Sequence, residues 1–174
     1  YFARKPLGNG LFKRALALLF VLFSTVLHAE QADYEKFRAE AEKFYVDGSF
    51  AKANELYLKA HEMELPKEDA RWVDFRLADT LWRSQAATQT ADTTKYEKAQ
   101  QQLEKLIRDI QRVEDHDRVW VEVQESLGDF FWTRRNNQNW GQSWTHYQPA
   151  LDWWAGAREI ELARKRYLKI VWTI

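Results

Sequence analysis

Cysteine is absent from this chain of 174 residues. The absence excludes disulfide bonds, thiol catalysis, cysteine-ligated zinc and a lipid-modified N-terminal cysteine. Glycine and proline are scarce, at six and three residues, and long stretches of the chain contain neither. A turn-rich β fold is therefore not expected, and a helical one is.

Neither sign of charge is in excess, because the chain has 26 basic and 26 acidic residues. Four of the basic residues and none of the acidic ones precede Glu30, which leaves 22 basic and 26 acidic residues in the remainder. This mildly acidic remainder lacks the basic patch that nucleic-acid binding requires. Nucleic acid is therefore not an expected partner.

Residues 1–29 have the order of features found in a secretory signal segment. Lys13 and Arg14 precede an apolar run over residues 15–23, and Ala29 comes just before charged residues. This order is typical of a signal peptide, and the run is short for a membrane span. We expect export to the periplasm or the medium, with cleavage after Ala29. The alternatives are a buried helix or an uncleaved inner-membrane anchor, which would be the only membrane contact.

Residues 30–174 are expected to form one all-α domain, because apolar residues recur at helical spacing in seven segments. The expected helices cover approximately residues 33–45, 53–65, 72–83, 96–110, 119–133, 143–154 and 159–172. Polar loops are expected at 84–94 and 134–142, and Pro149 is expected to interrupt or tighten the sixth helix. Three helical hairpins and a final helix would bury their apolar faces by stacking, as in an α-solenoid.

Small and aromatic residues recur in these segments at related positions. They are Ala41, Phe44, Ala53, Tyr57, Ala60 and Pro66 in the first unit, Leu77, Ala78, Leu81, Ala99, Leu103 and Leu106 in the second, and Leu127, Gly128, Phe131, Ser143, Tyr147 and Ala150 in the third. This pattern resembles the tetratricopeptide repeat (TPR). The resemblance implies a solenoid that binds or positions other proteins.

Gly128 is predicted to be a packing residue. Glycine in the middle of a helix costs roughly 1 kcal/mol relative to alanine, so close packing should offset the cost. On this interpretation Gly128→Leu should destabilise the fold and Gly128→Ala should be tolerated.

A second resemblance concerns residues 123–132 and 146–156. They are similar to the helical N-terminal region of large exported bacterial proteins of the alpha-2-macroglobulin family. This resemblance implies that the chain is the front part of a longer protein, with its own downstream domains as partners. The sequence contains no thioester or bait-region feature, so no inhibitory site is implied.

Motifs that would carry chemistry are not found. His116 lies among acidic residues, but no second histidine lies at metal-ligand spacing, and a charged link between helices is the favoured interpretation. Ser126 has no histidine near it in the sequence and no nucleophile-elbow glycines. Glycine-rich phosphate or dinucleotide loops are also absent. We therefore expect no enzyme activity, no metal and no cofactor.

Tryptophan is abundant and unevenly placed. All nine tryptophans lie at or after Trp72, and seven lie between Trp120 and Trp172. Most of these rings are expected to fill space between helices, whereas Trp140, in a polar loop, is expected to be exposed. The alternative is an exposed aromatic groove with Arg134 and Arg135 at its rim, because tryptophan and arginine are enriched at binding hot spots.

The leading functional hypothesis is a protein-interaction module whose concave face is formed by the first helix of each pair. Helical phase suggests a set of candidate partner-binding residues: Arg38, Lys52, Arg76, Arg83, Gln124 and Trp132, with Arg134 and Trp140 nearby in the loop. One alternative is a glycan-acting or glycan-binding helical protein that uses the aromatic groove. Another is a structural stalk of a larger multidomain protein.

The helix over 143–154 and the loop that contains Trp140 are expected to form the partner-facing or domain-facing surface. Trp153 and Trp154 point about 100° apart on a helix, so one of them must pack toward another layer. The helix over 159–172 can supply that layer. It is apolar at its end, where a solenoid would normally carry a polar cap.

Overall fold

A computed structural model describes residues 31–88, 93–134 and 138–174. This part of the chain is all-helical and contains no strand, which confirms the prediction of an all-α domain. The helices are residues 31–46, α2 (Phe50–His61), α3 (Lys67–Thr88), α4 (Thr94–Ile107), α5 (Arg118–Trp132), α6 (Trp140–Ala155) and α7 (Ile160–Thr173), with a 3-10 turn, η1 (Val113–Asp115), before α5. The predicted signal segment lies outside the described residues.

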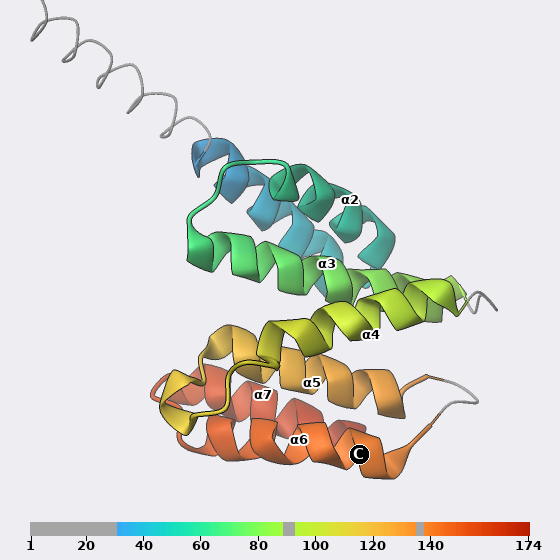
Figure 1. The fold of residues 1–174 in the computed structure, drawn as a ribbon, viewed down its shortest axis with the longest axis vertical. Helices are drawn as coiled ribbons and strands as arrows, with labels where there is room; N and C mark the ends of the chain where they lie inside the picture. Colours follow the sequence, from blue (N-terminus) through green and yellow to red (C-terminus); the bar gives the residue numbers. More distant parts are fainter. Residues whose placement is uncertain (1–30, 89–92, 135–137) are drawn as a thin grey trace, which may run out of the picture.

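Consecutive helices pack on one another, most extensively α2 on α3, α3 on α4, and α5 on α6. Figure 1 shows the helices following the chain from the helix of residues 31–46 at one end to α6 and α7 at the other. Helix α5 is the most enclosed, because every residue from Trp120 to Phe131 is buried. None of the helices in the described ranges is long and apolar enough to cross a membrane.

The turn after residues 31–46 lies at Gly48, between the first two helices that the sequence predicts. Gly48 has a φ of 73°, a left-handed conformation that glycine adopts without steric cost. The amide of Gly48 donates to the carbonyl of Tyr45, and the amide of Ser49 donates to that of Phe44 over 2.8 Å. These bonds satisfy the last carbonyls of the helix and turn the chain into α2.

Helix α3 is longer than the sequence predicts at both ends. It begins directly after Pro66, and Glu68 and Asp69 in its first turn favour the positive helix end. It also continues to Thr88, so the first part of the expected loop over 84–94 is helical. Ala86 packs against the apolar core, and this contact stabilises the helical conformation of the last residues of α3.

Helix α6 also departs from the prediction, because it begins at Trp140 rather than at Ser143. The Asn139 side chain caps this end by accepting a hydrogen bond from the amide of Gln142 over 3.1 Å. The helix runs through Pro149 without interruption. Tyr147 and Ala150 on either side of the proline are fully buried, so packing compensates for the missing proline N–H.

Apolar side chains form two clusters on opposite sides of α5. The first joins α5 to residues 31–46, α2, α3 and α4. The second joins α5 to α6 and α7 and contains Tyr147, Ala150, Trp154, Ala163 and Ile170. Trp154 is buried here while Trp153 is half-buried, as the expected divergence of the two rings requires.

Candidate functional site

Charged side chains gather where α3, α5, α7 and the helix of residues 31–46 face one another. Within α3, α5 and α7, neighbouring members of this group are three or four positions apart, so they lie on one face of each helix. We call the following set the charge network: Glu42, Arg76, Asp79, Arg83, Glu122, Glu125, Asp129, Arg166 and Lys169. The acids lie mostly on α5 and the bases on α3 and α7.

Arg76 connects the first pair of helices to α3 and α5. Its Nε and Nη2 atoms donate to the two carboxylate oxygens of Glu42, each over 2.9 Å. Its guanidinium also lies 4.2 Å from the centre of the Tyr45 ring and 4.6 Å from that of Trp72. Burial disfavours the charge of Arg76, but Tyr45 and Glu42 outweigh burial and raise its pKa. The arginine is therefore a buried, permanently charged junction.

Arg83 joins α3 to α5. Its Nε donates to Asp79 over 2.8 Å and its Nη2 to Asp129 over 2.6 Å. Burial alone would raise the pKa of Asp129, but Arg83, Lys169 and the hydrogen bonds from Arg83 and Tyr147 lower it to about 2. Burial would also raise the pKa of Asp79, but the charges of Arg83 and Arg76 outweigh burial and lower this pKa. Both aspartates are therefore fixed as anions.

Helix α7 contributes the opposing bases. Arg166 donates from Nε to Glu125 over 3.0 Å, and its Nη2 lies 3.2 Å from Glu122. Lys169 lies 3.4 Å from Asp129. Burial is the largest influence on Glu125 and raises its pKa, although Arg166 and Lys169 oppose the change. These contacts are the polar part of the attachment of α7 to α5.

The buried acids of the charge network are therefore paired with basic side chains of the fold. Glu122, Glu125, Asp79 and Asp129 are all less than 5% exposed, and their nearest charged groups are protein side chains. Buried Ser126 takes part in the same way, since it accepts from Trp82 Nε1 over 3.0 Å and bonds to Asp79. These pairs connect α5 to α3 and to α7.

The predicted partner-binding residues lie in several different surroundings. Arg76 and Arg83 belong to the charge network, and Arg38 is half-buried 3.4 Å from Asp69. Gln124, only 9% exposed, contacts Nδ1 of His146 over 2.7 Å. The structure does not bring these residues together as one open face. Lys52 lies exposed on α2, with its ammonium 5.4 Å from the Phe44 ring.

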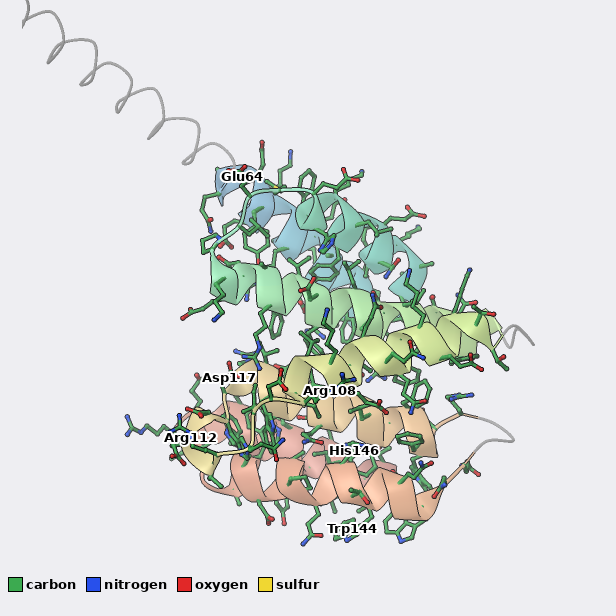
Figure 2. The ribbon with its side chains drawn as sticks, in the orientation of Figure 1. Glu64, Arg108, Arg112, Asp117, Trp144 and His146 are labelled. Carbon is green, nitrogen blue, oxygen red and sulfur yellow. The ribbon has the colours of Figure 1, made fainter. Side chains whose placement is uncertain are left out.

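The aromatic part of the prediction is brought together, although Trp140 is not in a loop. Trp140 lies in the first turn of α6, packs edge-on against Trp132 and stacks with Trp144 at 5.6 Å. Trp140 and Trp144 are 46% and 37% exposed. Figure 2 shows Trp144 projecting from the outer side of α6. Arg134 lies apart from this group, over the rings of Tyr96 and Phe130.

Exposed apolar side chains concentrate on the last two helices. Among the described residues, those of large size and high exposure after α5 are Trp140, Trp144, Ile160, Tyr167, Leu168, Val171, Trp172 and Ile174, whereas only Val46, Leu58 and Val113 precede them. We call Ile160, Tyr167, Leu168, Val171 and Trp172 the α7 stripe. The sequence predicts the apolar end of this helix but does not mark these residues as a site. Their helical spacing was the available signal.

Comparisons with protein-family models, with curated proteins and with solved structures found no match to this chain.

Proposed function

We propose that this chain is a non-enzymatic protein-interaction or scaffold module of an exported bacterial protein. Its helix pairs would stack as a TPR-like solenoid, and its partner would be another protein or further domains of the same polypeptide. The observation that carries the proposal is the concentration of exposed apolar side chains on α6 and α7. Large apolar patches on a folded protein mark contact surfaces, because leaving them in water is unfavourable.

The repeat assignment is supported by the small residues of the predicted pattern. Ala41 and Ala78 are fully buried, and the carbonyl of Gly128 accepts a hydrogen bond from Ser143 Oγ over 2.9 Å. Close approach of paired helices at small residues is what the TPR pattern requires. Export, in a periplasmic, secreted or membrane-anchored form, and membership of a larger alpha-2-macroglobulin-like protein are part of the same proposal. They rest on the sequence.

The non-enzymatic part of the proposal is supported by the charge network. The carboxylates of α5 and their arginine partners are buried and occupied with one another. The glycan-binding alternative is less well supported by the aromatic cluster. Trp140 and Trp144 stack on one another, which takes up part of the ring faces that a sugar would need. Apolar contact with a protein fits their exposed edges better.

Site-specific photo-crosslinking in cells that export the chain tests this proposal. A crosslinking residue at Val171 on α7, where the native side chain is 43% exposed, is expected to capture a defined protein. Leu58 on α2 is the matched control, because it is 50% exposed but lies away from the last helices. Equal capture from both positions, or capture only from Leu58, would refute the assignment of α6 and α7 as the contact surface.

A further inference from the structure

One face of α7 has no other helix packed along it among the described residues. Helices α2, α4 and α6 each follow an earlier helix and pack along it: α4 on α3 and α6 on α5 by extensive contact, and α2 on residues 31–46 through the Tyr45–Phe50 ring pair. Helix α7 packs on α6 through Ala163 and Ile170. The face that would receive a further helix carries the α7 stripe.

A groove runs between the C-terminal end of α6 and this face. Its volume is about 360 Å³, and its walls include Ile160, Tyr167 and Leu168. Tyr167 and Leu168 lie seven and eight residues after Ile160, and Val171 and Trp172 follow about one turn later on the same side of the helix. Together these residues form an apolar strip about three helical turns long. The groove lies along the first part of this strip, and an apolar strip of helical period fits another helix, whose side chains can interdigitate with those of α7.

The charged residues beside the groove indicate which kind of helix would bind in it. Arg164 is the one charged residue lining the groove, and no ion pair of Arg164 is found within the described residues. Lys165 beside it is exposed as well, whereas Arg166 and Lys169 point their charge inward to α5. A second copy of α7 laid parallel on this face would bring Arg164 and Lys165 of the two chains together, although exposed Glu161 lies on the same side of the helix. A helix with acidic residues along its flank would pair with them instead.

We infer that the groove beside α7 binds an amphipathic α-helix of another polypeptide, with its apolar face on the α7 stripe and an acidic flank against Arg164 and Lys165. This inference rests on the proposed function and specifies its partner. The apolar contact supplies affinity, and the basic flank selects orientation and partner, as charges at the rim of an interface do.

Two synthetic helical peptides test the inference with the full chain. Both carry leucine at positions i, i+3, i+4 and i+7, and they differ only in having glutamate or lysine on the flank. The glutamate peptide is expected to bind about fivefold more tightly at low salt, the scale of one or two exposed ion pairs. R164E should reverse the preference, and L168E should abolish binding of both peptides. L58E is the control and should change neither.

Three results would overturn the inference: equal binding of the two peptides, a preference that survives R164E, or binding unaffected by L168E. Circular dichroism of each variant checks that the fold is retained, and Leu168→Ser replaces L168E if the charged variant does not fold. Sedimentation would reveal a dimer that L168E breaks, and such a dimer would assign the groove to a second copy. If crosslinking from Val171 persists while the peptides bind equally, the acidic-helix inference fails and the interaction-module proposal stands.

Discussion

The ring of Tyr147 on α6 fills the space in which a Cβ atom on Gly128 of α5 would lie. An ideal Cβ at residue 128 would be 2.9 Å from Cγ of Tyr147 and closer still to its Cδ1 and Cε1 atoms. The ring is fully buried, and its hydroxyl donates to Asp129 over 2.7 Å. The packing role predicted for Gly128 therefore has a physical basis. The predicted tolerance of alanine at residue 128 has no such basis, because a single methyl group already collides with the Tyr147 ring.

We predict that Gly128→Ala lowers the free energy of unfolding by about 1–3 kcal/mol through overpacking, and that Gly128→Leu lowers it further. The roughly 1 kcal/mol that alanine normally gains in a helix is not enough to offset the collision. Urea denaturation measures both variants. Gly156→Ala is the control, since the nearest heavy atom to its Cβ would be 3.8 Å away. An alanine variant at residue 128 as stable as the parent would contradict this packing.

The acid response of the fold should report the contact between Tyr147 and Asp129. The pKa of Asp129 is lowered to about 2, so its contribution to stability is present above the unfolded value of about 3.9 and is lost as the pH falls toward 2. Tyr147→Phe removes one hydrogen bond to this anion and should cost about 1–3 kcal/mol at pH 7. Urea midpoints should show this deficit shrinking between pH 4 and pH 2. Exposed Tyr167→Phe is the control and should show no such deficit.

His146 should make the fold less stable in mild acid. Its pKa is lowered because burial disfavours the imidazolium, and Glu104 opposes this effect only in part. A lowered pKa means that the stabilising contribution is present above the unfolded value of about 6.5 and is lost as the pH falls below it. The urea midpoint should therefore drop between pH 7.5 and pH 5.5.

His146→Gln should remove most of that drop. Glutamine keeps a polar side chain near Gln124 but does not titrate, and it lacks the ring that stacks on Phe131. His61→Gln, on the exposed end of α2, is the control variant. If the pH dependence is the same in the parent and in His146→Gln, another group is responsible for it.

The attachment of α7 should depend on Arg166. Arg166→Leu removes the nearest α7 cation from buried Glu122 and Glu125. The cost should be about 3 kcal/mol, the lower end for a broken buried pair, because Lys169 remains 3.8 Å from Glu125 and Arg118 remains 2.9 Å from Glu122. Hydrogen exchange should show α7 losing protection before the other helices. Exposed Arg164→Leu is the matched control for stability. Equal protection of α7 in the two variants would show that apolar packing alone holds the helix.

A double-mutant cycle should show that the stability lost in Arg166→Leu comes from the interaction between Arg166 and Glu125. Glu125→Gln by itself should be close to neutral, because burial already raises the pKa of Glu125. In the Arg166→Leu background the same change should recover part of the lost stability, since it removes an uncompensated buried charge. Additive effects of the two substitutions would mean that Arg166 and Glu125 do not interact in solution.

The exported form of the protein is expected to begin just after Ala29. The basic start, the short apolar run and the small residue before Glu30 are the order that signal peptidase recognises. N-terminal sequencing of protein recovered from the periplasm or the medium is the measurement. A mature chain that still contains residues 15–23 would favour an anchor over a cleaved signal.

The sequence by itself determined the helical content of the described chain, the turn at Gly48 and the packing role of Gly128. Each of these depends on local spacing: apolar residues three and four apart define a helix face, and only glycine enters the left-handed turn without steric cost. The apolar end of α7 was predicted for the same reason.

The tertiary structure decided what the polar residues do. Arg83 meets Asp129 across 46 positions of sequence, and Arg166 meets Glu125 across 41. Helical phase placed Arg76 and Arg83 on one face of α3, but it could not show that α5 and α7 bring acids and bases to close that face. Packing likewise drew Trp140 into α6 beside Trp132 and kept α3 helical to Thr88. Which charges are buried and which rings are left exposed depends on neighbours distant in sequence, and no local pattern records them.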